Sequence, residues 1–138
     1  MCSSDLYGGN PLGCAAALAV LDTFEGEDLL QRGVGLGRRL RAGLDGLKEK
    51  HTAIGDVRGL GFMQAIELVS DRDRKTPDPD RAQQVIEQAR HDGLLVIKCG
   101  VHRNVIRFLG PLVMSDDDVD EALAIMDGAL AKTGSPSE

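Results

Sequence analysis

Five leucines recur at helical spacing and constrain the fold more than any other feature: Leu29, Leu36, Leu40, Leu44 and Leu47. Their separations place them on one face of an amphipathic helix, whose other face carries arginine and lysine side chains. After residue 54 the pattern changes to the dense run VRGLGFMQAIELV, which indicates a strand pair or a bulged strand. A chain that must bury a helical stripe together with strands is expected to form an α/β domain.

Further helices and strands are indicated by caps and by short apolar runs between turn residues. The predicted elements are a helix over 10–25 after Asn10-Pro11, a helix opened by Asp78-Pro79 and ended at Gly93, strands over 94–98 and 104–109, and a last helix after a capping box of Ser115 and Asp118. Strands joined by both short loops and helices predict a small mixed or antiparallel sheet covered by helices.

Length and charge restrict the class of protein. With 138 residues the chain is long enough for one domain with a hydrophobic core, and a second domain is not expected. The net charge of -6, with acidic and basic residues interspersed, argues against a nucleic-acid partner, because phosphate binding needs clustered lysine and arginine. The longest apolar run, residues 12–21, is too short for a membrane span of roughly 20 residues.

The cysteines and histidines give no disulfide or metal signal. Cys2, Cys14 and Cys99 are odd in number and far apart, which fits neither a disulfide framework nor a zinc site and favours a reducing, cytoplasmic setting. The histidines have no partner at metal-ligand spacing. We therefore predict no metal site, and we interpret Cys99 as structural rather than nucleophilic.

Arg107 is the sharpest candidate for a binding residue. It interrupts the apolar strand predicted over 104–109 with a guanidinium that stays charged, and a guanidinium removed from water needs an anion. Two interpretations remain open. Arg107 pairs with an internal carboxylate or reaches solvent from the edge of the sheet, or it makes a two-point contact with the carboxylate of a substrate.

Two glycine segments have different interpretations. The segment YGGNP at residues 7–11 precedes the first predicted helix, where backbone N–H groups can hold an anion such as phosphate, although a glycine turn before a helix is also common without a ligand. The segment GLG at residues 59–61 indicates a bulge or a close backbone approach. Phe62 and Met63, which follow it, are predicted to be core residues.

Four segments taken together resemble the C-terminal part of class III aminotransferases, which are pyridoxal-phosphate enzymes. The segments are YGGNPLGCAAALAVLD, VRGLGFMQAIEL, DGLLVIKCG and NVIRFLGPL, in this order and at similar separations. The last two, as CG-x-x-x-NVIRFL-x-PL, are most similar to 4-aminobutyrate aminotransferases. The resemblance implies an α/β fold, the small C-terminal domain of a fold type I pyridoxal-phosphate enzyme.

The resemblance also implies a division of the chain. Residues 7–26 would form a helix that links a large cofactor domain to the small domain at residues 27–132, and residues 133–138 would be a disordered tail. Residues 1–6, MCSSDL, look foreign, because the string resembles the translated end of a common sequencing adapter. Leu6 stands where the family has a threonine that contacts the cofactor phosphate.

For the site, the resemblance implies that Arg107 binds the α-carboxylate of glutamate or 2-oxoglutarate. Tyr7 and Gly8 would lie near the cofactor phosphate of the neighbouring subunit, although Leu6 lacks the threonine hydroxyl. The family's Schiff-base lysine belongs to the large domain, and no lysine of this chain lies in a matching motif. We therefore expect no catalytic residue here and an inactive chain.

The reaction that the resemblance implies moves the amino group of 4-aminobutyrate to 2-oxoglutarate, with pyridoxal 5'-phosphate as cofactor and a homodimer as the parent. Two alternatives stay open. One is another class III aminotransferase that acts on ornithine, acetylornithine or a diamine, because donor specificity is set largely upstream. The other is a non-catalytic α/β module that binds a dicarboxylate through Arg107.

Overall fold

The computed structural model describes residues 8–133. Its elements, in chain order, are α2 (Pro11–Gly26), α3 (Leu29–Lys50), β1 (Ile54–Leu60), β2 (Met63–Asp71), β3 (Thr76–Pro77), α4 (Pro79–His91), β4 (Ile97–Cys99), β5 (Val105–Phe108) and α5 (Asp116–Thr133). The predicted order of helices and strands is confirmed, and the strand pair expected after residue 54 is the hairpin of β1 and β2. The two-residue strand β3 was not predicted.

The strands form one sheet in the order β1-β2-β5-β4, with β3 added at the end of β2. Of the two arrangements that the sequence left open, the antiparallel one is present in every strand pair of residues 8–133. Arg58 of β1 lies opposite Ala65 of β2, and Ala65 lies opposite Arg107 of β5. This register decides which side chains share a face, because side chains alternate along a strand.

The helices begin where side chains satisfy backbone N–H groups that have no partner inside the helix. At α2 the side chain of Asn10 accepts a hydrogen bond from the N–H of Gly13 at 2.8 Å, and Asp78 caps α4 in the same way. At α5 the N–H of Ser115 donates to the Asp118 carboxylate at 2.8 Å, and the N–H of Asp118 donates to Ser115 Oγ at 3.0 Å. This reciprocal pair is the predicted capping box.

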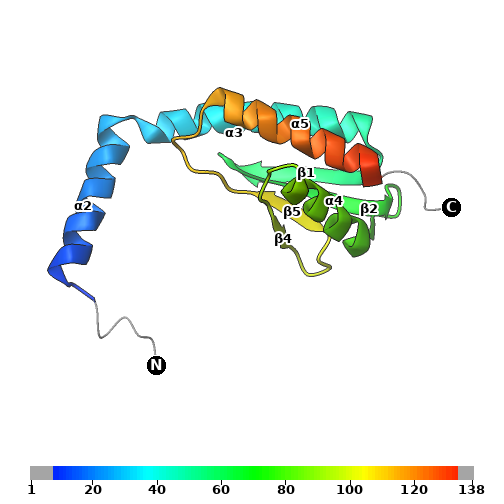
Figure 1. Cartoon of the computed structure of the whole chain (residues 1–138), viewed down its shortest axis with the longest axis horizontal. Helices are drawn as coiled ribbons and strands as arrows, with labels where there is room; N and C mark the ends of the chain where they lie inside the picture. The colour runs from blue at the N-terminus through cyan, green and yellow to red at the C-terminus, as the bar shows by residue number, and fades with distance from the viewer. Residues whose placement is uncertain (1–7, 134–138) are drawn as a thin grey trace.

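One face of the sheet, which we call the covered face, packs against α3, α4 and α5 (Figure 1). Leu36, Leu40 and Leu44 of the α3 stripe are at most 3% exposed there. Ile66 and Ile106 form a cross-strand pair on this face, and both are 0% exposed. The apolar strand residues of the covered face are Ile54, Val57, Ile66, Leu68, Ile106 and Phe108.

No helix of residues 8–133 packs on the opposite face, which we call the open face. Its side chains alternate with the core residues and are mostly exposed or partly buried. Its residues are Asp56 and Arg58 of β1, Ala65 and Glu67 of β2, Val105 and Arg107 of β5, and Ile97 and Cys99 of β4. The open face therefore collects charged side chains, whereas the covered face collects apolar ones.

Glycines let the turn between β1 and β2 approach α3 closely. Gly61 has a φ of 55°, a left-handed conformation that favours glycine, and a Cβ added at Gly37 of α3 would collide with the Gly61 carbonyl. The close backbone approach predicted for residues 59–61 is therefore present. Phe62 is a core residue as predicted, at 7% exposed. The same prediction for Met63 is wrong, because Met63 points to the open side and is 45% exposed.

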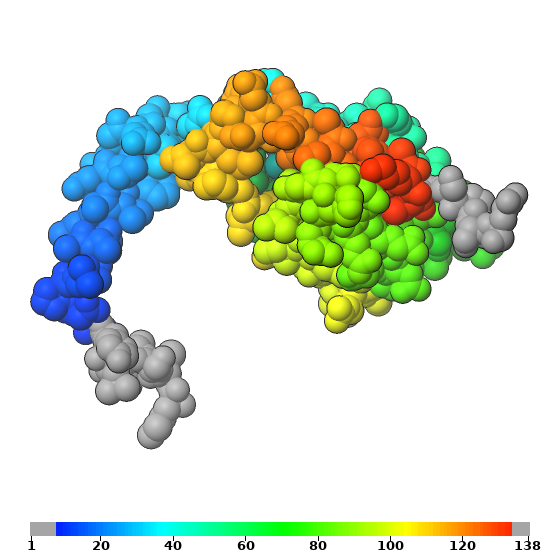
Figure 2. All heavy atoms as spheres, viewed as in Figure 1, coloured from blue at the N-terminus to red at the C-terminus, as the bar shows by residue number. Residues whose placement is uncertain are grey.

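The helix α2 stands apart from the rest of the molecule as an arm (Figure 2). It has no buried residue, and Leu12, Leu18 and Leu21 are 81%, 62% and 59% exposed. The apolar face of this helix therefore has no partner within residues 8–133. At the other end, α5 continues to Thr133, one residue past the predicted end of the domain. The rest of the predicted tail, and the predicted leader at residues 1–6, lie outside the described residues.

Candidate functional site

Arg107 lies on the open face between Ala65 of β2 and Ile97 of β4. Its neighbours along β5, Ile106 and Phe108, point to the other side of the sheet, into the core. Because β5 lies between two other strands, Arg107 is not at an edge of the sheet. The strand thus presents one guanidinium from the middle of a face that no described helix covers.

Arg107 makes no ion pair with a carboxylate of the described residues. Its Nε is buried and has no hydrogen-bond partner there. A buried N–H left without an acceptor costs about 1–3 kcal/mol. Of the two interpretations of the sequence, the internal salt bridge is therefore absent from residues 8–133. The Arg107 guanidinium is therefore available to an anion that comes from outside residues 8–133.

A hollow of about 320 Å³ adjoins this guanidinium. The Arg107 hollow is lined by Arg58, Gly59, Leu60, Met63, Gln64, Ala65 and Arg107. Apart from the arginines, its wall is largely apolar, and Ala65, which lies opposite Arg107, contributes only a methyl group to it. A positive group beside an apolar wall fits a ligand with a short methylene chain that ends in a carboxylate.

Two carboxylates share the open face with Arg107, and both are bound by Arg58. Arg58 Nη1 donates to Glu67 Oε2 at 2.5 Å and to Asp56 Oδ2 at 2.9 Å. Asn104 Nδ2 donates to the other carboxylate oxygen of Glu67 at 3.2 Å. The hydrogen bond from Arg58 is the main cause that lowers the pKa of Glu67, so this carboxylate stays ionised.

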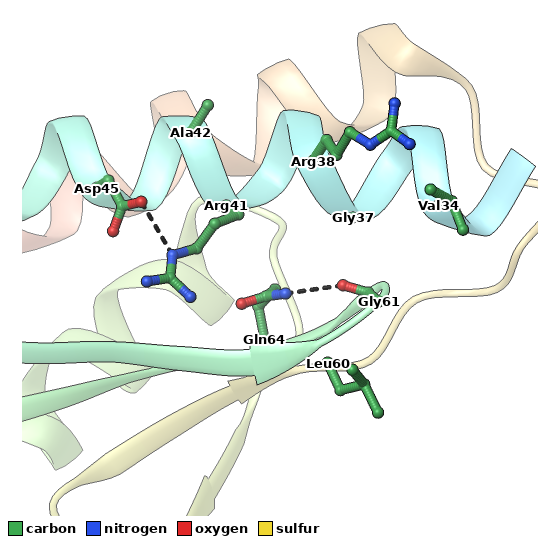
Figure 3. Close-up of a pocket in the computed structure, with 9 residues that line it drawn as sticks. All are labelled: Val34, Gly37, Arg38, Arg41, Ala42, Asp45, Leu60, Gly61 and Gln64. Atoms are coloured by element: carbon green, nitrogen blue, oxygen red, sulfur yellow. Dashed lines mark hydrogen bonds and ion pairs between the residues drawn. The ribbon is translucent and has the colours of Figure 1, made fainter.

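A second hollow, of about 650 Å³, lies between α3 and the turn of the β1–β2 hairpin (Figure 3). Arg41 Nε contacts Asp45 Oδ2 at 2.9 Å, and Gln64 Nε2 donates to the Gly61 carbonyl at 2.7 Å. The charge of Arg41 is thus already balanced on its own helix, while Arg38 is exposed to solvent. This second hollow offers a weaker anion site than the Arg107 hollow, because none of its guanidinium nitrogens is buried without a partner.

The glycine turn before α2 does not join the Arg107 site within this chain. Tyr7 lies outside the described residues, and Gly8 is exposed. Gly9 adopts a φ of 74°, which suits a glycine turn. Figure 1 shows that α2 carries this turn away from the sheet. The structure therefore does not bring the predicted phosphate contact and the predicted carboxylate contact together.

None of the lysines of the chain has its side chain on the open face beside Arg107, although Lys48 Nζ of α3 comes within 3.9 Å of Asp56. Lys98 is the nearest along the sheet, but it pairs with Ile106 of the covered face, and its Nζ donates to the Pro79 carbonyl at 2.8 Å. The others are Lys48 and Lys50 on α3, Lys75 between β2 and β3, and Lys132 on α5. Over residues 8–133 we find no group of histidine, cysteine and acidic side chains that could hold a metal ion. None of the helices in that range is long and apolar enough to cross a membrane.

Arg58, Glu67 and Asn104 are site residues that were not predicted from the sequence. A signal existed for the first two, because a turn at residues 61–62 places residue 58 opposite 65 and residue 56 opposite 67. Asn104 is 1% exposed and donates to the Leu68 carbonyl at 2.8 Å, which ties β5 to β2. Nothing in its sequence context distinguishes it from a loop asparagine.

Comparison with known proteins gives a consistent result. Residues 4–130 match the family Aminotransferase class-III. The chain is 48% identical over 120 residues to the 5-aminovalerate aminotransferase DavT of Pseudomonas aeruginosa and 47% identical over 120 residues to the 4-aminobutyrate aminotransferase GabT of Escherichia coli. Each alignment covers 87% of this chain and 28% of the relative.

A solved structure agrees with these relatives. The amine transaminase from an uncultivated Pseudomonas species, in its PLP-bound form, matches with a TM-score of 0.86 and 37% identity. The match covers 93% of this chain and 29% of that protein, so the chain spans under a third of the length of these relatives. From its α/β fold and the family match over residues 4–130, this chain belongs to the class III aminotransferases.

Proposed function

We propose that this chain is the C-terminal part of a pyridoxal-phosphate-dependent aminotransferase that moves the amino group of 4-aminobutyrate to 2-oxoglutarate. Within that enzyme, Arg107 binds the α-carboxylate of 2-oxoglutarate or glutamate. The observation that carries the proposal is the guanidinium of Arg107, which is partly buried on the open face without a carboxylate partner in residues 8–133.

The chemistry of the Arg107 hollow supports a dicarboxylate with a short chain. The planar guanidinium can donate two parallel hydrogen bonds to one carboxylate, which fixes both its position and its orientation. The apolar side chains of Leu60, Met63 and Ala65 offer a surface for methylene groups. Arg107 would therefore orient the co-substrate and would not take part in bond making.

The cofactor chemistry belongs to residues beyond this chain in our proposal. Pyridoxal phosphate, when bound, supplies the electron sink for amino transfer, and the protein supplies orientation and electrostatics. The residues present fit only part of this arrangement, because Arg107 can hold a substrate anion but no lysine lies on its face. We therefore propose that the lysine is provided from outside this chain, and that the chain alone is inactive.

Steady-state kinetics of the full-length enzyme test the role of Arg107. Arg107→Ala should raise KM for 2-oxoglutarate by roughly thirty-fold or more, since removing a charged partner from a desolvated contact costs about 2 kcal/mol or more. Arg107→Lys should recover only part of this loss, because a lysine lacks the fork of two parallel donors. Arg38→Ala, in the second hollow, is the matched control and should leave KM unchanged. An unaltered KM in Arg107→Ala contradicts the assignment.

The amino donor is the finer part of the proposal. The near-equal identity to a 5-aminovalerate and a 4-aminobutyrate aminotransferase, 48% and 47%, supports an ω-amino acid and makes 5-aminovalerate the second candidate. Comparing kcat/KM for the two donors and for ornithine separates these possibilities. A preference for ornithine would overturn the ω-amino-acid assignment.

A non-catalytic dicarboxylate-binding module is the competing class of function. Calorimetry of the 138-residue chain with 2-oxoglutarate distinguishes it. We expect no measurable heat, because a single guanidinium beside an open hollow supplies only part of a binding site. Micromolar binding by the isolated chain would favour the module.

We also propose that the parent enzyme is a homodimer. The exposed leucines of α2 mark a face that a part outside this chain covers, either the large domain of the same parent or a second subunit, and the mass of the parent separates the two. Light scattering of the full-length enzyme should give twice the monomer mass, and a monomer at working concentration contradicts the proposal.

A further inference from the structure

Arg107 has a potential partner on its own face that it does not use. Because Ala65 lies opposite Arg107 and Glu67 lies opposite Val105, Glu67 and Arg107 are diagonal neighbours of adjacent strands. Such diagonal pairs have Cα atoms about 7–8 Å apart, which is within the reach of long side chains. An arginine and a glutamate at this spacing commonly form a cross-strand ion pair, yet Arg107 has no such bond.

Glu67 instead accepts hydrogen bonds from two other side chains, one on each side of β2. On β2 it lies between Arg58 of β1 and Asn104, the residue before β5, and each binds a different carboxylate oxygen, at 2.5 and 3.2 Å. Asn104 is fixed in turn by its bond to the Leu68 carbonyl. Each oxygen of Glu67 therefore already accepts a hydrogen bond, and neither of these bonds comes from Arg107.

The second acidic residue of this face is restrained by the same arginine. Asp56 accepts from Arg58 at 2.9 Å and lies 3.9 Å from Lys48 Nζ. Asp56 is on β1, two strands from Arg107, so Glu67 is the carboxylate of this face that can compete for the guanidinium. Arg58 thus forms hydrogen bonds with both of these acidic side chains, Asp56 and Glu67.

We propose that Arg58 is a positioning residue that sequesters Glu67 and thereby keeps Arg107 free to bind the substrate carboxylate. This inference rests on the proposed function for its consequence in catalysis, but the pairing itself does not depend on it. Without Arg58, Glu67 would turn to Arg107, and the substrate would have to displace an internal carboxylate. On the open face, Arg58 then binds the Glu67 carboxylate, and Arg107 binds the carboxylate of the substrate.

The titration of Glu67 tests the pairing without any assay of activity. In the 138-residue chain with labelled glutamate carboxyl carbons, NMR gives the pKa of Glu67. Arg58 and Asn104 bind this carboxylate, Asp56 shares Arg58 with it, and Arg107 is its diagonal neighbour. We expect Arg107→Met alone to change this pKa little. In the Arg58→Met background, the pKa should stay low and should then rise when Arg107→Met is added. Equal effects of Arg107→Met in both backgrounds would overturn the inference, since they show a long-range charge effect and no pair.

Kinetics of the full-length enzyme test the consequence for binding. Arg58→Met should raise KM for 2-oxoglutarate about two- to five-fold, the range expected for breaking a partly exposed ion pair, and should change kcat less. Arg58→Met with Glu67→Gln has the charge of the original protein and should restore KM. Arg81→Met on α4 removes an equal charge far from this face and should leave KM unchanged. Failure of Glu67→Gln to restore KM contradicts the inference.

The two proposals fail in different ways. If Arg107→Ala leaves KM unchanged while the Glu67 titration shows the switch of partners, the substrate role is wrong and the sequestering role stands. If Arg107→Ala raises KM while Glu67 never pairs with Arg107, the reverse holds. Should Arg58→Met not fold, Arg58→Gln keeps an N–H donor near Glu67 and should give the same pattern with smaller amplitude.

Discussion

On the covered face, Ile66 and Ile106 meet as a cross-strand pair that is fully buried, whereas on the open face the adjacent pair, Ala65 and Arg107, leaves a hollow beside a charged group. The two pairs are one residue apart along the same two strands. Side-chain alternation alone separates them. Apolar contacts therefore stabilise the covered face. On the open face, the pairing of the charged side chains decides which of them is available to bind a ligand.

The comparison also shows why the faces respond differently to change. A buried apolar side chain contributes through contacts on all sides, so its removal leaves a cavity. A partly exposed ion pair is screened by water and contributes little to stability, but it fixes where a charge lies. We therefore expect stability to depend on the covered face and binding specificity to depend on the open face.

The largest expected effect compares the same substitution on the two faces. Ile106→Ala on the covered face should lower the free energy of unfolding by about 2–5 kcal/mol, because the surrounding core cannot fill the space. Ile97→Ala, on the neighbouring strand but on the open face, is the control and should cost much less, because Ile97 is 50% exposed. Urea unfolding of the two variants measures both. Equal losses would break the distinction between the faces.

Two glycines of α3 test the packing of the covered face, because alanine at each should change the free energy of unfolding in opposite directions. Gly37→Ala should lower the free energy of unfolding by about 1–3 kcal/mol, because its Cβ would overlap the Gly61 carbonyl. Gly35→Ala meets no neighbouring atom and should stabilise the chain by up to about 1 kcal/mol through helix propensity. Thermal unfolding gives the two signs. Stabilisation by both variants would show that the turn does not pack tightly on α3.

The smallest expected effect is a pH dependence that belongs to the open face. The folded state lowers the pKa of Glu67, chiefly through the hydrogen bond from Arg58. Its contribution to stability is therefore present above the ordinary pKa of a glutamate and is lost as the pH falls through the lowered folded value. Glu67→Gln should flatten the fall in unfolding free energy over that acidic range. An identical pH profile in both proteins contradicts the ion pair.

The sequence was sufficient to predict the order of helices and strands and the apolar stripe of the covered face, because these signals are local. The leucine spacing of α3, the caps at Asn10 and Asp78 and the capping box before α5 each involve residues within one or two turns. Hydrophobic burial follows directly from such patterns, so the order of elements and the layering were predictable. The resemblance to class III aminotransferases added the domain type.

The open face was less predictable because it depends on register between strands far apart in the chain. Arg107 stood out as a charge in an apolar strand, but its lack of a partner depends on Glu67 and Arg58, which lie 40 and 49 residues earlier. Asn104 gives no signal until the strands are paired. Met63 was misassigned for a different reason, since its face is set by the local turn that pairs it with Leu60.

The most direct test of the central claim is a crystal structure of the full-length enzyme with the non-reactive dicarboxylate glutarate. We predict that one carboxylate of glutarate lies about 2.7–2.9 Å from two guanidinium nitrogens of Arg107, with Arg58 still bound to Glu67. A glutarate bound elsewhere, with Arg107 paired to a carboxylate of the protein, would contradict the account.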